Sequence, residues 1–295
     1  MITKTAMITI CGRPNVGKST LTNALVGEKI AIVSNKPQTT RNRISAVVNR
    51  GDTQFVIIDT PGFNKPRTRL GDYMVNLVKE SVADVDAVML LVEPIANIGR
   101  QEEELIARIK ETGVPAILII NKIDTVEKTE LLEVMAAYSA VHDFDAIIPM
   151  SAKNGEGLDE LLSELGKYAQ PSPQLFPDDM ICDQPEKQIC AELVREKLLL
   201  CLDKEIPHGT AVEVTRFTER DNGIIDLDVT IYCEKASHKG IIIGKQGAML
   251  KKIGELARND IEAFMGTKVF LQTWVKVKEN WRDSTAQLRN FGFTE

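Results

Sequence analysis

The first 170 residues alternate short apolar runs with longer segments in which apolar residues recur at helical spacing. The apolar runs predict strands, and the segments between them predict helices. Strands that alternate with helices usually pair in parallel, so the pattern predicts an α/β fold with a mostly parallel sheet. The predicted strands are Ile8–Cys11, Ile44–Val48, Phe55–Ile58, Ala87–Val92, Ala116–Ile120 and Ile147–Met150, and the predicted helices are Ser19–Val26, Leu70–Ala83, Gln101–Glu111 and Leu131–Val141.

A proline-rich stretch at residues 171–180 interrupts this alternation. Proline cannot continue a helix and holds the residue before it in an extended conformation, so we predict a linker here between domains at 1–170 and 181–295. The second domain has the predicted order α-β-β-α-α-β and is therefore of the α+β class. Its elements are an apolar helical stripe from Cys190 to Leu202, strands at Ala211–Thr218, Ile224–Cys233 and Val269–Val277, and two helices joined at Gly244–Gly247.

Hydrophobic residues make up 43% and charged residues 26% of the chain, as in an ordinary globular protein. The longest apolar runs are too short to cross a bilayer, and the first residues do not resemble a signal peptide. The 5 cysteines have no Cys-x-x-Cys spacing, so we expect reduced thiols rather than disulfides or metal ligands. These features favour a cytoplasmic protein.

Charge is distributed unevenly in this chain, whose net charge is −6. Acidic residues outnumber basic ones from Asp178 to Glu234, whereas residues 235–254 contain lysines and no acid. A local basic patch on an acidic protein can bind phosphate groups. On charge alone, a solvated lysine face is the simpler interpretation.

The segment Gly12-Arg-Pro-Asn-Val-Gly-Lys-Ser19 matches the phosphate-loop pattern Gly-x-x-x-x-Gly-Lys-Ser/Thr between a predicted strand and a predicted helix. In such loops the backbone N–H groups and the helix N-terminus bind the phosphates of a nucleotide. Lys18 is placed for the β- and γ-phosphates, and the Ser19 hydroxyl for Mg²⁺. The predicted nucleotide-binding residues of this loop are Gly12, Asn15, Val16, Gly17, Lys18, Ser19 and Thr20.

Two further segments fit a site for the γ-phosphate and its metal ion. Asp59-Thr-Pro-Gly62 follows a predicted strand, so Asp59 is placed to hold Mg²⁺ through a water, and the Gly62 N–H to bind the γ-phosphate. A threonine of the polar segment 35–42 should add a hydroxyl to the metal ion. We favour Thr40 over Thr39. The predicted metal residues are Ser19, Thr40 and Asp59, and the predicted catalytic residues are Asn15, Lys18, Thr40 and Gly62.

Base recognition is predicted for Asn121-Lys122-Ile-Asp124, which also follows an apolar strand. An aspartate here can accept hydrogen bonds from N1–H and the 2-amino group of guanine, a pair that adenine does not offer. Ser151-Ala152-Lys153, after the last strand of the domain, can add a backbone N–H toward the guanine O6. GTP is therefore preferred over ATP.

These motifs, in this order, resemble the translation-factor-related GTPases, and Gly12–Thr20 is most similar to the branch that contains the Era, EngA and TrmE families. In that branch the asparagine equivalent to Asn15 is associated with a potassium ion, so the resemblance implies K⁺ beside GTP/GDP and Mg²⁺. Ras-like enzymes have a water-orienting glutamine where this chain has Phe63. A phenyl ring cannot polarise water, which implies slow intrinsic hydrolysis and leaves open what orients the water.

The second domain carries Gly244-Lys-Gln-Gly247 between two predicted helices. A bare Gly-x-x-Gly is also a common helix–helix turn. Within the order α-β-β-α-α-β it resembles a type II KH domain, whose Gly-x-x-Gly loop clamps single-stranded RNA. Trp274 and Trp281 bracket Lys276 and Lys278 and could stack near RNA, but for Trp274 core packing is the favoured interpretation. The predicted RNA contacts are Lys239, Gly244, Lys245, Gln246, Gly247 and Lys251.

One GTPase domain, a proline-rich linker and one C-terminal KH domain together resemble the Era family. EngA-like proteins would need a second phosphate loop, which is not found here. The resemblance implies a monomer that binds the 3′ end of 16S rRNA during assembly of the 30S ribosomal subunit, with peripheral contact to the inner membrane as a lesser implication. Two alternatives stay open: a GTP-gated binding module with negligible hydrolysis, and a membrane-associated signalling GTPase whose C-terminal domain binds protein.

Overall fold

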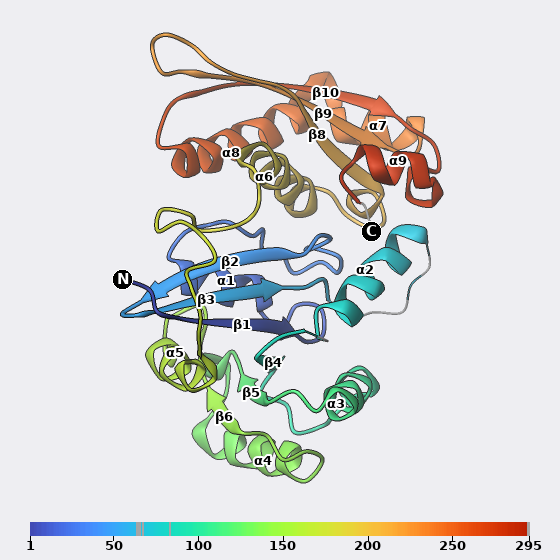
Figure 1. Ribbon diagram of the computed structural model, residues 1–295. Coiled ribbons are helices and arrows are strands. Elements are labelled where there is room, and N and C mark those ends of the chain that lie inside the picture. Colours follow the sequence, from blue (N-terminus) through green and yellow to red (C-terminus); the bar gives the residue numbers. More distant parts are fainter. Residues whose placement is uncertain (63–65, 67, 83, 294–295) are drawn as a thin grey trace. The chain divides into compact units, whose positions relative to one another are not determined.

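The computed structural model describes residues 1–62, 66, 68–82 and 84–293 of the 295-residue chain. The chain forms two compact units, each with its own sheet (Figure 1). The domain limits expected at residues 170 and 181 stay a prediction. The first unit comprises Met1–Ala31, Thr40–Lys65 and Met74–Asp183, and the second comprises Ile32–Thr39, Pro66–Tyr73 and Gln184–Glu295.

The sheet of the first unit has the strand order β2-β3-β1-β4-β5-β6, with β7 paired to β1. Its pairs are parallel except β2 with β3 and β1 with β7, which confirms the predicted α/β fold with a mostly parallel sheet. The strands are β1 (Lys4–Cys11), β2 (Ile44–Arg50), β3 (Thr53–Asp59), β4 (Ala87–Val92), β5 (Ala116–Ile120), β6 (Ala146–Pro149) and β7 (Gln170–Pro171).

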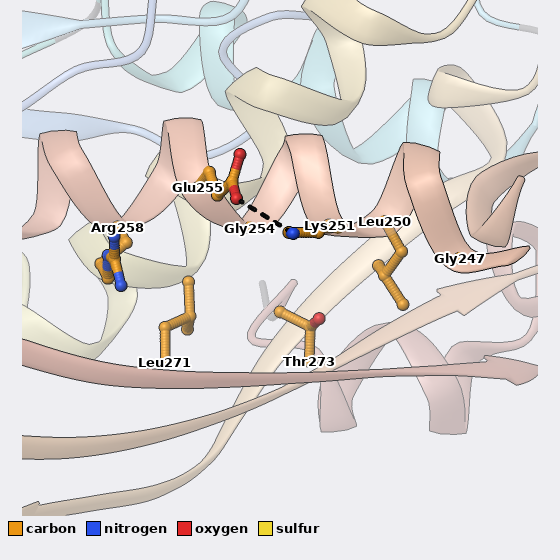
Figure 2. A pocket seen from close by; sticks show the side chains of 8 residues that line it. All are labelled: Gly247, Leu250, Lys251, Gly254, Glu255, Arg258, Leu271 and Thr273. Atoms are coloured by element: carbon orange, nitrogen blue, oxygen red, sulfur yellow. Dashed lines mark ion pairs between the residues drawn. The ribbon is translucent and has the colours of Figure 1, made fainter.

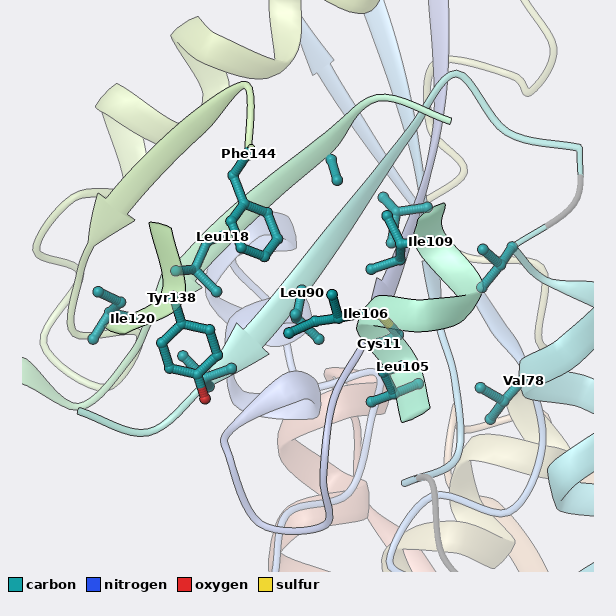
Figure 3. Close-up of a cluster of buried hydrophobic side chains, with 14 of the residues drawn as sticks. Cys11, Val78, Leu90, Leu105, Ile106, Ile109, Leu118, Ile120, Tyr138 and Phe144 are labelled. Carbon is teal, nitrogen blue, oxygen red and sulfur yellow. The ribbon is translucent and has the colours of Figure 1, made fainter. Parts of the chain in front are cut away.

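One face of this sheet is covered by helices α2, α3 and α4, whose apolar residues pack on β4 and β5 (Figure 3). Leu105 and Ile109 of α3 and Tyr138 of α4 are almost fully buried in this cluster. Helix α5, where Leu161 and Leu165 are buried, was not predicted. The helices are α1 (Lys18–Val26), α2 (Arg69–Glu80), α3 (Arg100–Thr112), α4 (Lys128–Ser139) and α5 (Leu158–Leu165).

The second unit has the predicted order α-β-β-α-α-β, followed by a short helix α9 that was not predicted. Its sheet has the order β10-β9-β8, in which β9 is parallel to β10 and antiparallel to β8. In the described part of the chain, no helix has both the length and the apolar composition needed to cross a membrane. The elements are α6 (Glu186–Cys201), β8 (Thr210–Glu219), β9 (Ile225–Cys233), α7 (Ala236–Ile243), α8 (Ala248–Met265), β10 (Val269–Val277) and α9 (Thr285–Asn290).

Helix α6 buries consecutive charged residues beside its apolar stripe. The Lys197 ammonium donates to Glu196 at 2.6 Å and to Asp260 of α8. Glu196 also accepts the backbone N–H of Val33 at 2.9 Å, and the Arg195 guanidinium donates to the carbonyl of Thr39. Buried charges are tolerated when they are paired in this way. The segment 32–39 is therefore held by α6 as part of the second unit.

The two tryptophans have opposite environments, and the expectation that Trp274 packs in the core is wrong. Trp281 is fully buried, and its indole N–H donates to the carbonyl of Gly209 at 2.9 Å. Trp274 is 44% exposed, because alternate side chains of a strand point to opposite faces and Trp274 lies on the face of β10 that points away from α8. The residues directly before and after Trp274 in β10 are the ones that pack toward the helices.

Candidate functional site

The loop between β1 and α1 has a backbone that only glycine fits at two positions. Gly12 has φ 154° and Gly17 has φ 105°. A Cβ atom would lie 2.4 Å from the Leu91 carbonyl oxygen at Gly12, and 2.2 Å from the Asn121 side-chain nitrogen at Gly17. Asn15 is also left-handed, with φ 68°. The loop therefore comes close to β4 and to the loop after β5, as a phosphate cradle requires.

Lys18 is folded back over this loop. Its ammonium donates to the carbonyls of Gly12 at 3.1 Å and Arg13 at 2.9 Å, and the side chain is buried. Burial lowers the pKa of Lys18, while the nearby Asp59 opposes that shift. An anion bound in the loop would stabilise the charged form further. The side chain is thus positioned for the phosphate contact predicted from the sequence.

The three predicted metal residues lie together: Ser19 in the first turn of α1, Asp59 at the end of β3 and Thr40 in the segment before β2. The Ser19 hydroxyl donates to Asp59 Oδ2 at 2.8 Å and lies 2.8 Å from the Thr40 hydroxyl. Burial raises the pKa of Asp59 to about 6, against the opposing effects of Lys18 and Ser19. Asp59 Oδ1 is buried with no hydrogen-bond partner among the described residues. A carboxylate with a spare oxygen beside two hydroxyls is a donor set that fits Mg²⁺.

The neighbouring threonines have different partners. The Thr39 hydroxyl donates to the carbonyl of Lys36 at 2.6 Å and lies 2.9 Å from the Ser34 hydroxyl. Only Thr40 of this pair reaches Ser19. The geometry therefore favours Thr40, as the sequence analysis did.

The Asp-x-x-Gly loop is anchored to the sheet and lies against the phosphate loop. The Thr60 hydroxyl, which the sequence analysis did not single out, donates to the Ile10 carbonyl of β1 at 2.8 Å. A Cβ atom at Gly62 would lie 3.0 Å from the Cα of Pro14. Gly62 is therefore close to the loop that should hold the phosphates. Phe63 stands where Ras-like enzymes have a water-orienting glutamine, and it lies outside the described residues.

Asn121 joins two loops through a buried side-chain amide. Its nitrogen donates to the carbonyl of Val16 at 2.8 Å, and its oxygen accepts the backbone N–H of Ala152 at 2.9 Å. Both ends of the amide are thus used inside the protein, in a residue only 3% exposed. Asn121 fixes the phosphate loop and the loop at 151–153 relative to each other.

The predicted base-reading residues lie beside this amide. The Ser151 hydroxyl donates to Asp124 Oδ1 at 2.7 Å and so orients that carboxylate. Lys122 is left-handed with φ 64°, and its ammonium donates to the carbonyl of Asn15 at 2.7 Å. Lys153 is exposed. The loops after β5 and β6 thus meet at the phosphate loop.

Three charged residues of this site were missed by the sequence analysis. Glu93 Oε1 accepts from Lys122 at 2.6 Å, and its other oxygen lies 3.4 Å from the Arg13 guanidinium. Arg13 also pairs with Glu102, which is 2% exposed. Glu93 directly follows β4. In the same way Asn121 directly follows β5, and Asp59 is the last residue of β3. That position was the available signal, because ligands bind at the carboxyl ends of parallel strands.

The Gly-x-x-Gly loop of the second unit is an exposed turn between α7 and α8. Gly244 has φ 74°, and a Cβ atom there would lie 2.7 Å from the Cβ of Met249. Gly247 has φ 79° with open space around it, and Gln246 is left-handed with φ 52°. Lys245 and Gln246 are exposed. The loop therefore presents its backbone and one cation to solvent at the start of α8.

A groove of about 330 Å³ runs from this loop between α8 and β10 (Figure 2). Of the predicted RNA contacts, Gly247 and Lys251 line it, whereas Lys239 is half-buried on α7 and does not. Lys251 lies 3.9 Å from Glu255. The contribution of β10 was not predicted from the sequence, because no local motif marks a groove wall. The lining residues are Gly247, Leu250, Lys251, Gly254, Glu255, Arg258, Leu271 and Thr273.

Known proteins match both units. A family model described as 50S ribosome-binding GTPase matches residues 7–122, and one described as KH domain matches residues 205–282. GTPase Era of Ruminiclostridium cellulolyticum is 52% identical over 290 residues, which are 98% of this chain and 97% of the relative. GTPase Era of Clostridium kluyveri is 47% identical, with 98% and 99% covered.

Solved structures agree over the whole chain. A crystal structure of Era in complex with MgGDPNP and nucleotides 1506-1542 of 16S ribosomal RNA has a TM-score of 0.95 at 36% identity and covers 99% of this chain and 100% of that one. A crystal structure of a single-residue variant of Aquifex aeolicus Era bound to GDP.AlF4- has a TM-score of 0.94 at 36% identity, with the same coverage. Because both family models match and relatives are this similar over nearly its full length, the chain belongs to the Era family of GTPases.

Proposed function

We propose that this protein binds the 3′ end of 16S rRNA through its KH domain and uses GTP hydrolysis to control that binding during assembly of the 30S ribosomal subunit. The observation that carries the proposal is the presence of a phosphate site and a Gly-x-x-Gly groove on one chain. The Era structure in complex with 16S ribosomal RNA supports the choice of RNA.

In the nucleotide site, the backbone of Gly12–Thr20 surrounds the phosphates, and Lys18 contacts their outer oxygens. Ser19, Thr40 and Asp59 would hold Mg²⁺, which would supply positive charge to neutralise the phosphates. The Gly62 N–H contacts the γ-phosphate. Asp124 reads guanine, with Lys122 and the loop Ser151-Ala152-Lys153 placed around the base. No described side chain is assigned to orient the attacking water.

Without the γ-phosphate, Thr40 would lose its proposed contact to the metal ion, and the Gly62 N–H would lose its proposed contact to the γ-phosphate. Thr40 directly follows the segment 32–39, which Arg195 and Glu196 hold within the second unit. A change at Thr40 would be passed along the chain to residues that pack on α6. We propose that the nucleotide state changes in this way how the KH domain presents its groove to RNA.

We propose that the protein is a cytoplasmic monomer with domains at residues 1–170 and 181–295. Peripheral contact with the inner membrane rests on the family resemblance alone. The alternative of a GTP-gated module with negligible hydrolysis predicts no phosphate release with or without RNA. The alternative of a membrane-associated signalling GTPase predicts a C-terminal domain that binds protein and leaves RNA unbound.

Replacing Asp124 by asparagine should move base preference from guanine to xanthine. The amide nitrogen would face the guanine donors, whereas it can donate to the 2-oxo group of xanthosine triphosphate. GTP affinity should fall roughly 100-fold, the cost of two mismatched polar contacts to the base. Competition binding measures both nucleotides. Unchanged guanine preference in the variant would show that Asp124 does not read the base.

Potassium should accelerate GTP hydrolysis relative to sodium at the same ionic strength, because Asn15 stands at the position that the family associates with this ion. Asn15→Ala should abolish the difference while GTP remains bound. Phosphate release measured in both salts gives the answer, and equal rates for the parent protein would rule out the potassium site.

Replacing Lys245 and Gln246 together by aspartate should weaken binding to single-stranded RNA from the 3′ end of 16S rRNA. The slope of log affinity against log salt should become shallower by about 0.7 for each phosphate that the variant loop no longer neutralises. The groove lies in the second unit, so affinity for a GTP analogue should match that of the parent. A salt titration of RNA binding measures the effect.

The matched control for charge carries Gln101→Asp and Lys110→Asp on α3, which make the same change in net charge within the first unit. It should bind RNA much like the parent. Parental RNA affinity in the loop variant would remove the KH assignment of RNA binding. An equal loss of RNA affinity in the control would show that the effect comes from net charge and not from the loop.

A further inference from the structure

Strand β10 presents alternate side chains to two different surfaces. Leu271 and Thr273 point toward α8 and line the groove (Figure 2). Because successive side chains of a strand point to opposite faces, Phe270 and Trp274 lie on the other face of the sheet. Phe270 is 50% exposed and Trp274 is 44% exposed. Two large aromatic rings thus stand in solvent on the strand that forms the groove wall.

Charged residues of both signs surround the rings, since Asp226 and Asp228 of β9 are the cross-strand neighbours of Phe270 and Gln272. The Arg220 guanidinium lies 5.4 Å from the centre of the Phe270 ring and pairs with Asp226. Lys276 is exposed and follows Trp274 by two residues, so it lies on the same face of β10. An exposed ring beside a cation can stack a base and attract its phosphate. We call Phe270, Gln272, Trp274 and Lys276 the aromatic face.

The arrangement of this face suits a nucleic acid better than a protein. The two rings are four residues apart on one strand, roughly 13 Å, so each would stack a separate base. Gln272, which is exposed, lies between them. The centre of a protein interface is instead a continuous apolar patch depleted of charge. Separate aromatic platforms with nearby cations are typical of proteins that bind single strands.

The aromatic face is continuous with the groove across a single strand. β10 is an edge strand of the three-stranded sheet, so it has a neighbouring strand on one side. Leu271 and Thr273 face the groove, while their sequence neighbours face the opposite surface. An RNA strand that leaves the groove over this edge would reach Trp274 directly.

We propose that the aromatic face is a second binding surface for single-stranded RNA, on which Trp274 and Phe270 stack bases that lie beyond the segment held in the groove. This inference rests on the proposed RNA binding of the groove and extends it. The ligand is one continuous strand, longer than the roughly four nucleotides that a KH groove holds.

Three RNA probes with a common five-nucleotide segment test the proposal: the segment alone, the segment extended at its 5′ end, and the segment extended at its 3′ end. At least one extended RNA should bind the parent more tightly than the short one. Trp274→Ala should remove that gain, roughly tenfold or more, since stacking on one aromatic side chain contributes that much. Fluorescence anisotropy measures the three affinities.

Matched variants separate stacking from loss of apolar surface. Trp274→Phe should keep most of the gain, whereas Trp274→Leu should behave like Trp274→Ala. Leu200→Ala removes another exposed apolar side chain of the second unit and should bind all three RNAs like the parent. Because Trp281 is buried, quenching of tryptophan fluorescence by the extended RNA should come mainly from Trp274 and be lost in Trp274→Phe. Urea midpoints equal to the parent's show that the variants fold.

Equal affinity of parent and Trp274→Ala for all three RNAs would overturn the proposal. So would a concentration-dependent dimer of the parent that Trp274→Ala dissolves, which would make this face a contact between two copies of the chain. If the short RNA fails to bind the parent, the groove assignment fails. If the short RNA binds but extension adds nothing, only the aromatic face is excluded.

Discussion

Asp59 is a fully buried carboxylate at the end of β3, and the phosphate site is organised around the cost of burying its charge. Burial disfavours the charged form of this acid and raises its pKa from the usual value to about 6. Ser19 satisfies one oxygen, and Lys18 supplies opposite charge nearby. The other oxygen has no hydrogen bond in the described part of the chain. In the proposed site, a divalent cation held together with Thr40 would complete the pairing that a buried charge needs.

The second constraint is the buried amide of Asn121, which links the phosphate loop to the base-reading loop. It uses its donor on Val16 and its acceptor on Ala152, so that movement of either loop would leave a buried polar group unpaired. Ser151 in turn orients Asp124. The proposed phosphate and base contacts are therefore parts of one preformed framework, while Thr40 and Gly62 belong to the segments proposed to respond to the γ-phosphate.

The sequence predicted those parts of the fold and site in which a local pattern has a physical requirement. A parallel sheet needs apolar strands between helices, and phosphate loops need glycine where a Cβ would clash. Glu93 escaped prediction because a single carboxylate after a strand has no motif. The buried charge of Lys197 escaped it because its partner Asp260 is distant in sequence. Trp274 was misplaced because the exposure of an edge strand depends on what lies on each face of the sheet, which the alternation of its residues does not reveal.

The magnesium dependence of nucleotide binding tests the central role of Asp59 most directly. The measurement is the affinity of the parent and of Asp59→Asn for a non-hydrolysable GTP analogue as Mg²⁺ is raised. Mg²⁺ should tighten binding to the parent roughly tenfold or more, equivalent to at least ~1.4 kcal/mol, and should have little effect on the variant, in which the buried charge is absent. The same magnesium dependence in both proteins would contradict the assignment of Asp59 as the carboxylate around which the site is built.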